Sequence, residues 1–277
     1  MGKTLWRTQS RLGATLMIGV AVLSCTSAHA SGDLLVAPTR LVLDSNRSSE
    51  IVLNNIGNET ATYRVSLELR RMSPDGQLEE VTTPNDSEQA VLGMIAYAPR
   101  RVTLAPNQPQ AIRVGVQPPA GLPDGEYRAH MLFRAIPLAQ AATPNSGQSN
   151  GLSIALTPIY GVSIPIIVRR GQLVAGASIA NVAFGKDEEN KPAINLTLNR
   201  DGNRSVYGEL RVTPHGQDKP IAQIRGVAIY PEITSRQVTL PLANDAAATF
   251  RGPAKVQYIA DEASGGGVIA ETDVVLK

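Results

Sequence analysis

The residues that could do covalent chemistry begin with a serine in a glycine-flanked pattern, Gly147-Gln148-Ser149-Asn150-Gly151. This G-x-S-x-G pattern is that of a hydrolase nucleophile elbow, in which a strand precedes the serine and a helix follows it. Here a polar stretch rich in Gly, Ser, Asn and Ala surrounds Ser149, and an alternating apolar run follows. These flanks favour a plain loop. A secreted hydrolase that uses Ser149 therefore stays as a minor alternative.

Histidine and cysteine chemistry is sparse in this sequence. Beyond the first 30 residues the histidines are His130 and His215, and there is no cysteine. Neither histidine lies at metal-ligand spacing from another His or Cys, which argues against a zinc site or a histidine-dependent triad. Phosphate-binding glycine motifs in a strand–helix setting are also missing. We therefore predict no enzyme activity, no metal and no cofactor, and we expect His130 to be a packed or rim residue of a strand.

Arg40 is a candidate for binding rather than catalysis. Pro38-Thr39-Arg40 separates two apolar runs, Leu34–Val36 and Leu41–Leu43, that otherwise read as one strand. An arginine at such a place is either a surface residue or a guanidinium fork that holds a partner's carboxylate. The residue type alone leaves both interpretations open.

A long stretch, Leu152–Val168, alternates between apolar residues and small or polar ones, and Arg169 and Arg170 follow it. In a β-strand the even-numbered residues share one face. A strand with this much apolar surface is an aggregation hazard unless something covers it. It is therefore either a central core strand or a strand kept for a partner. The even set is Leu152, Ile154, Leu156, Tyr160, Val162 and Ile164.

The elements that would position these residues are short strands separated by turn signals. Strand-like runs recur every 8–12 residues or so, and Gly, Pro, Asn and Asp clusters such as Pro74-Asp75-Gly76 and Asp201-Gly202-Asn203 divide them. A short helix fits within 86–95, and no longer segment has helical periodicity. The pattern predicts an all-β protein with two immunoglobulin-like β-sandwich domains in tandem, 31–169 and 170–277.

Residues 1–30 have the pattern of a secretory signal. Lys3, Arg7 and Arg11 precede a short apolar run, and Ala28-His29-Ala30 forms an A-x-A cleavage site. We expect cleavage after Ala30 and export of the remaining chain. The alternative, a lipobox that would leave a lipidated Cys25, stays open. The apolar run is too short for a transmembrane helix, and no later run is long enough either.

The charge balance disfavours nucleic acid as a partner. The chain has 26 Lys+Arg and 24 Asp+Glu, and the signal holds three of the basic residues and no acidic one. The exported part therefore has 23 basic and 24 acidic residues, a net charge of −1. Bulk nucleic-acid binding needs a basic surface.

Several of these segments, in this order, resemble the periplasmic chaperones of the chaperone–usher pathway, which assemble pili. The resemblance covers the whole chain after the signal and is best in the first domain. It rests on Ala37-Pro38-Thr39-Arg40, Glu50–Asn55, Ala61–Val65, a middle segment with Pro99, Leu104, Pro106, Gln110, Ile112 and Arg113, then Leu122–Arg128, Phe133, Ile136-Pro137, and the loop before the long alternating strand.

The resemblance implies a boomerang-shaped pair of domains and a mechanism by strand donation. Subunits of pili in that pathway are incomplete immunoglobulin-like folds, and the chaperone lends a strand to fill their open groove. The even set listed above would supply the inserting or core-facing side chains. We expect its N-terminal members to be donated and its C-terminal members to pack within the chaperone. Arg40 matches the family arginine that anchors the subunit's C-terminal carboxylate, and an outer-membrane usher would receive the subunit.

The sequence also departs from the family. Familiar members pair that arginine with a lysine on the donor strand, and Pro165 stands at the corresponding place here. Arg113, Arg134 or Arg169 are candidates for the second cation. A dimer in which two copies cap each other's donor strands stays open. The remaining alternative is a secreted two-domain adhesion or surface-binding module.

Overall fold

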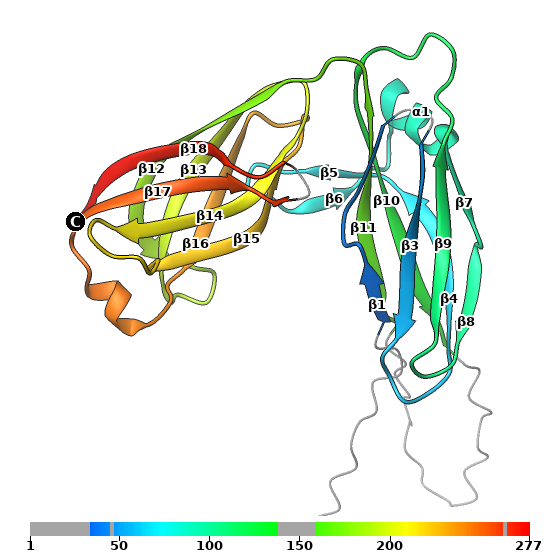
Figure 1. Ribbon diagram of the computed structural model, residues 1–277, viewed down its shortest axis with the longest axis horizontal. Coiled ribbons are helices and arrows are strands. Elements are labelled where there is room, and N and C mark those ends of the chain that lie inside the picture. Colours follow the sequence, from blue (N-terminus) through cyan, green and yellow to red (C-terminus); the bar gives the residue numbers. More distant parts are fainter. Residues whose placement is uncertain (1–33, 45–46, 138–158, 263–264) are drawn as a thin grey trace, which may run out of the picture. The chain divides into compact units, whose positions relative to one another are not determined.

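The computed structural model describes residues 34–44, 47–137, 159–262 and 265–277. These residues form β-strands, one α-helix and one 3-10 helix, which confirms the predicted all-β class. The strands make two sandwiches (Figure 1). Leu152, Ile154 and Leu156 of the alternating stretch, the G-x-S-x-G segment, the signal and Cys25 lie outside the described residues.

The first sandwich has two sheets with a common apolar core. One sheet has the order β1 (Leu34–Ala37), β3 (Ser48–Asn55), β9 (Pro109–Val116) and β7 (Ile95–Ala98). The other has the order β2 (Leu41–Asp44), β11 (Gly161–Arg170), β10 (Gly125–Ile136), β4 (Ala61–Glu68) and β8 (Arg101–Leu104). The predicted break around Arg40 is thus the point where the chain leaves one sheet and enters the other.

The inner faces of these sheets follow the period-2 pattern of the sequence. In β10 the odd-numbered residues Tyr127, Ala129, Met131 and Phe133 are buried in the core, while the even-numbered ones point to the outer face. The residues of β3 and β9 alternate in the same way, with Ile51 and Ile112 fully buried.

A helix and a hairpin connect β4 to β7. The hairpin consists of β5 (Arg70–Met72) and β6 (Leu78–Glu80) around the predicted Pro-Asp-Gly turn. The helix α1 (Asp86–Met94) forms where a short helix was predicted. It begins with a capping box, in which the Asn85 side chain accepts from the Glu88 N–H and the Glu88 carboxylate accepts from the Asn85 N–H.

The second sandwich has seven strands in sheets of three and four, as expected for an immunoglobulin-like sandwich. The first is β12 (Ala175–Lys186), β13 (Pro192–Gly202) and β16 (Ser235–Pro241). The second is β15 (Ala222–Ile229), β14 (Val206–Pro214), β17 (Gly252–Ala260) and β18 (Val268–Leu276), and the 3-10 helix η1 (Asp245–Thr249) precedes β17. The core of this sandwich includes Leu196, Leu210 and Tyr258.

Candidate functional site: the β11 edge and the Arg40 pocket

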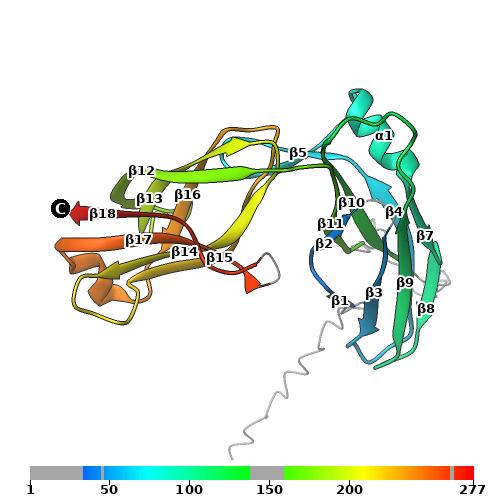
Figure 2. The ribbon, with the colours of Figure 1, turned by 45° about the horizontal axis from the view of Figure 1, so that its top comes forward.

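The strand β11 has neighbours of very different length on its two sides. Its whole length, Gly161–Arg170, pairs antiparallel with β10. On the other side β2 pairs with it in parallel, and only along Ile166–Arg169. Figure 2 shows β2, β11 and β10 as neighbours. Among the described residues, Gly161–Pro165 therefore form an open strand edge.

The register shows which backbone groups face this open edge. The Ala135 N–H donates to the Tyr160 carbonyl at 2.9 Å, so the backbone of Tyr160 points toward β10. Because the direction alternates along a strand, the backbones of Val162 and Ile164 also point to β10, and those of Gly161 and Ser163 point to the open side.

Pro165 is the third residue whose backbone points to the open side, and it has no N–H to donate. Its pairing with His130 is at a position without ladder hydrogen bonds. A proline is tolerated at such an edge position because no sheet hydrogen bond is lost. The hydrogen-bonding groups that face this open edge are therefore the N–H and C=O of Gly161 and Ser163.

The even-numbered residues that the sequence placed on one face of the strand fall into a buried group and an exposed group. Ile164 is buried in the core of the first sandwich, and Val162 packs against that core. Tyr160 is 54% exposed, and its neighbour Ile159 is 56% exposed. No sequence pattern singles out Ile159, because it falls on the odd face of the alternating stretch.

Arg40 lies between β1 and β2 and contacts three side chains of the second sandwich. Its Nη2 donates to Ser205 Oγ at 3.1 Å and its Nη1 to Tyr230 Oη at 3.4 Å. The guanidinium also lies over the Tyr207 ring, 4.5 Å from the ring centre. Its Nε is buried and has no hydrogen-bond partner among the described residues. Arg40 thus has donor capacity left for a ligand.

A pocket of about 320 Å³ adjoins Arg40. Pro165 of β11 lines it, so the structure brings together the two positions that the resemblance pairs. A second guanidinium, that of Arg236, lines the same pocket. Arg236 donates through Nη1 to the Ala228 carbonyl at 2.6 Å, and its Nε is buried without a described partner. Burial lowers the pKa of Arg236. Two guanidiniums with spare N–H groups suit an anionic ligand such as a carboxylate.

The turn of the β5–β6 hairpin packs against the guanidinium of Arg236. Gly76 has φ +89°, and a Cβ atom at this position would overlap the guanidinium of Arg236. The backbone N–H of Gln237 donates to the Pro74 carbonyl at 2.7 Å. The Pro-Asp-Gly signal predicted the turn, but nothing in the sequence pointed to its contacts some 160 residues further along the chain.

Arg169, Arg113 and Arg134 are the three candidates for the second cation, and each has different surroundings. Arg169 pairs at 3.1 Å with Glu126, whose side chain is fully buried. Glu126 also accepts from the Ser205 N–H at 3.1 Å and the Ser205 hydroxyl at 3.0 Å, so Ser205 links Glu126 to Arg40. Arg113 pairs with Glu50 on β3, in the other sheet, and Arg134 is exposed on β10.

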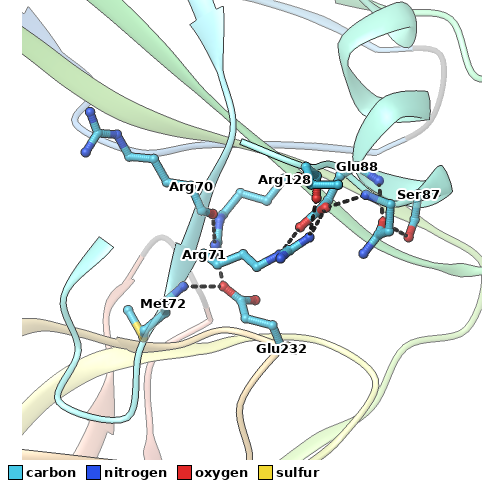
Figure 3. A network of polar contacts seen from close by, with 9 residues as sticks. Arg70, Arg71, Met72, Ser87, Glu88, Arg128 and Glu232 are labelled. Atoms are coloured by element: carbon cyan, nitrogen blue, oxygen red, sulfur yellow. Dashed lines mark hydrogen bonds and ion pairs between the residues drawn. The ribbon is translucent and has the colours of Figure 1, made fainter. Parts of the chain in front are cut away.

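A further polar network joins β5, β10 and the segment after β15 (Figure 3). Glu232 accepts from the Met72 N–H at 2.9 Å and pairs with Arg128. Arg128 also donates to the Arg70 carbonyl at 2.7 Å, and its guanidinium lies 3.4 Å from the centre of the Tyr230 ring. Tyr230 therefore contacts both Arg128 and Arg40, which connects this network to the pocket.

His130 is a packed residue of β10, only 1% exposed. Neither of its ring nitrogens has a hydrogen-bond partner among the described residues. Burial, followed by the charges of Arg128, Arg70 and Arg40, lowers the pKa of His130 from 6.5 to about 3. The neutral imidazole is thus part of the packing at moderate pH.

Within the described ranges, no group of three or more His, Cys, Asp or Glu side chains is placed to hold a metal ion. The helices of this part of the chain are also too short or too polar to cross a membrane.

We predict that His130 makes the protein less stable in acid. The folded-state pKa of His130 lies below the unfolded one, so between about pH 6.5 and pH 3 the unfolded chain binds a proton that the folded protein does not. The unfolding free energy should therefore fall as pH drops through this range, by up to a few kcal/mol. In His130→Met this part of the decline should be missing. Urea unfolding at several pH values measures it, and equal pH slopes for both proteins would contradict the prediction.

Comparison with known proteins gives similar architectures without sequence relatives. No protein-family model and no curated protein sequence matches the chain. Among solved structures, the Pseudomonas aeruginosa CupB2 chaperone matches with a TM-score of 0.45 and 14% identity, over 88% of this chain and 100% of that one. The E. coli chaperone DraB matches with a TM-score of 0.44 and 16% identity, over 88% and 98%.

A complex of the Salmonella enterica SafA pilin with the SafB chaperone is matched with a TM-score of 0.44 and 16% identity, over 88% of this chain and 97% of that one. At such scores the function has to be argued from the residues of this chain. The chain is similar to solved structures that are named as chaperones, several of them for fimbriae or pili.

Proposed function

We propose that this protein is an exported, non-enzymatic chaperone that captures subunits of pili by adding one of its strands to their incomplete fold. The observation that carries the proposal is the open edge of β11. Within the part of the chain that the structure describes, Gly161–Pro165 have a neighbouring strand on one side only, and the alternating apolar stretch of the sequence leads directly into them. An open edge beside such a stretch supports strand addition, in which backbone hydrogen bonds bind and alternate side chains enter pockets.

The side chains available for such an interaction are those ahead of the buried end of β11. Ile164 is engaged in the protein's own core, so the proposed donor set is Leu152, Ile154 and Leu156, with Tyr160 at the boundary. Burying a Leu or Ile side chain is worth roughly 1.5–3 kcal/mol. Three such residues would contribute several kcal/mol before the cost of ordering the segment is subtracted.

The position of Arg40 supports a role in holding the end of the captured chain. The strand β2 occupies the β11 edge from Ile166 onward, and Arg40 immediately precedes β2. A partner strand that ran parallel to β11 along Gly161–Pro165 would end beside Arg40. Its terminal carboxylate would then meet the pocket that Arg40 and Arg236 both line. We propose Arg236 as the second cation, in place of the family's lysine.

The remaining parts of the proposal follow the resemblance. The protein would act in the periplasm after cleavage of its signal following Ala30, and it would pass subunits to an outer-membrane usher. We expect no nucleotide requirement, because the folding of the subunit would supply the free energy of assembly.

We predict that Leu156→Asp abolishes capture of the subunit while the protein stays folded. A carboxylate placed in an apolar groove carries a desolvation cost of several kcal/mol, enough to reduce binding by at least about a hundredfold. Tagged wild type and variant are purified from the periplasm, and bound proteins are identified by mass spectrometry. Leu35→Asp is the matched control, since Leu35 is 50% exposed on β1 in the other sheet.

Two results would count against strand donation. One is equal recovery of a small secreted β-rich subunit with wild type and Leu156→Asp. The other is loss of the cooperative unfolding transition in Leu156→Asp, which would place Leu156 in the protein's own core. Recovery of no subunit with wild type would favour the adhesion-module alternative.

We also predict that Arg40→Ala weakens subunit capture by about tenfold or more, because a charge-assisted hydrogen bond to a carboxylate is worth about 1.5–3 kcal/mol. Arg113→Ala, which removes an exposed cation paired with Glu50, should have no effect on capture. Co-purification at equal expression measures both, with urea unfolding as a check on folding. If Arg40→Ala is folded and recovers as much subunit as wild type, the carboxylate anchor is refuted.

A further inference from the structure

Three arginines stand in one row across the outer face of the sheet that contains β11. Arg134 of β10 is directly opposite Arg64 of β4, and Arg64 is directly opposite Arg101 of β8. All three are exposed. Their side chains point away from the core, since the neighbouring positions Phe133, Val65 and Val102 are the buried ones. We call this row the arginine ladder.

The arginine ladder has an unfavourable arrangement of charge. Directly opposite residues on one face of a sheet have Cβ atoms about 4.5–5.5 Å apart, and like charges at these positions destabilise the pair. None of the three side chains makes a hydrogen bond or ion pair with another described side chain. By contrast, some exposed cations elsewhere have acidic partners, as in Arg113 with Glu50 and Arg225 with Glu209.

The row continues to the open edge of β11. Arg134 is opposite Gly161, the first residue of β11, which has no side chain to extend over the arginine. Neighbouring strands lie about 4.7–4.9 Å apart. A strand added at the β11 edge would therefore lie about 10 Å from β10, within reach of an arginine and an acidic side chain that extend toward each other.

We infer that the arginine ladder is a docking surface for an acidic segment of the same subunit whose strand adds to the β11 edge. The inference rests on the proposed function and specifies the chemistry of the partner: carboxylates beside its strand-binding groove, facing three guanidiniums. Guanidiniums bind carboxylates through parallel hydrogen bonds. The segment would neutralise three charges that have no acidic partner among the described side chains.

The extent of the row favours a protein segment over a polyanion. DNA-binding proteins commonly neutralise about 6–10 phosphates, whereas the ladder offers three cations on two strand spacings, and the exported chain has a net charge of −1. Complementary charges at the rim of an interface mainly speed encounter and select partners, and salt weakens them. The ladder should therefore act most strongly at low ionic strength.

The test compares the triple variant Arg64→Gln/Arg101→Gln/Arg134→Gln with a control that removes the same charge elsewhere, Arg113→Gln/Arg225→Gln/Lys255→Gln. The control residues are exposed and paired with acids. Each protein is tagged, and the subunit recovered with it is quantified in about 50 mM and about 1 M salt, where the Debye length falls to roughly 3 Å. Leu156→Asp is run in parallel.

We expect the ladder variant to recover at least about fivefold less subunit than wild type at low salt, with the difference disappearing at high salt. The control should match wild type throughout. Urea unfolding should show the ladder variant to be as stable as wild type or more stable, because like charges are removed. A purely structural role of these arginines would instead lower its stability.

Several outcomes would overturn the inference. Equal recovery with wild type and the ladder variant at low salt, while Leu156→Asp recovers none, would remove the ladder and leave strand donation standing. Ladder-dependent binding to phosphatidylglycerol vesicles with unchanged subunit recovery would assign the row to a lipid surface instead. Recovery of no subunit by wild type would refute the proposed function and the inference together.

Discussion

The hydrogen-bond ladder between β10 and β11 is the constraint on which the proposed site depends. It fixes Gly161–Arg170 along their whole length, while β2 satisfies the other side only from Ile166 onward. The unequal lengths of these two pairings create the open edge. They also place Ile164 in the core and direct the backbones of Gly161 and Ser163 outward. Sheet edges of this kind are usually blunted in soluble proteins, so an edge left open beside an apolar stretch favours a binding role.

Buried charges connect this edge to the second sandwich. Glu126, fully buried, binds Arg169 and Ser205, and Ser205 in turn accepts from Arg40. Removing one partner from a buried pair is costly, because the other charge is left unpaired. Losing one of the contacts around Arg40 would therefore destabilise the protein, so these contacts hold the guanidinium in place. Its Nε has no hydrogen-bond partner among the described residues and stays available for a ligand.

Much of the fold was predictable from the sequence because it depends on local patterns. Period-2 alternation and turn residues gave the strands, and Asn85 with Glu88 gives α1 its capping box. The two positions Arg40 and Pro165 were singled out, and both line one pocket. Their roles in binding, like those of Leu152, Ile154 and Leu156, remain predictions.

The features that were missed depend on long-range pairing. Arg40 contacts Ser205 and Tyr230, which are 165 and 190 residues away in the chain. The place of Arg236 in the pocket could be recognised only from the folded structure. The arginine ladder likewise could be recognised only from the register of β8, β4 and β10. Local periodicity says which face a residue occupies, but not which residue of another strand lies beside it.

Amide hydrogen exchange of β11 tests the central claim most directly. In the free protein, the N–H groups of Gly161 and Ser163 should exchange quickly, while those of Val162 and Ile164, bonded to β10, should be protected. In the complex purified with its subunit, Gly161 and Ser163 should become protected as well. If they exchange equally fast with and without the subunit, no strand is added at this edge and the account is wrong.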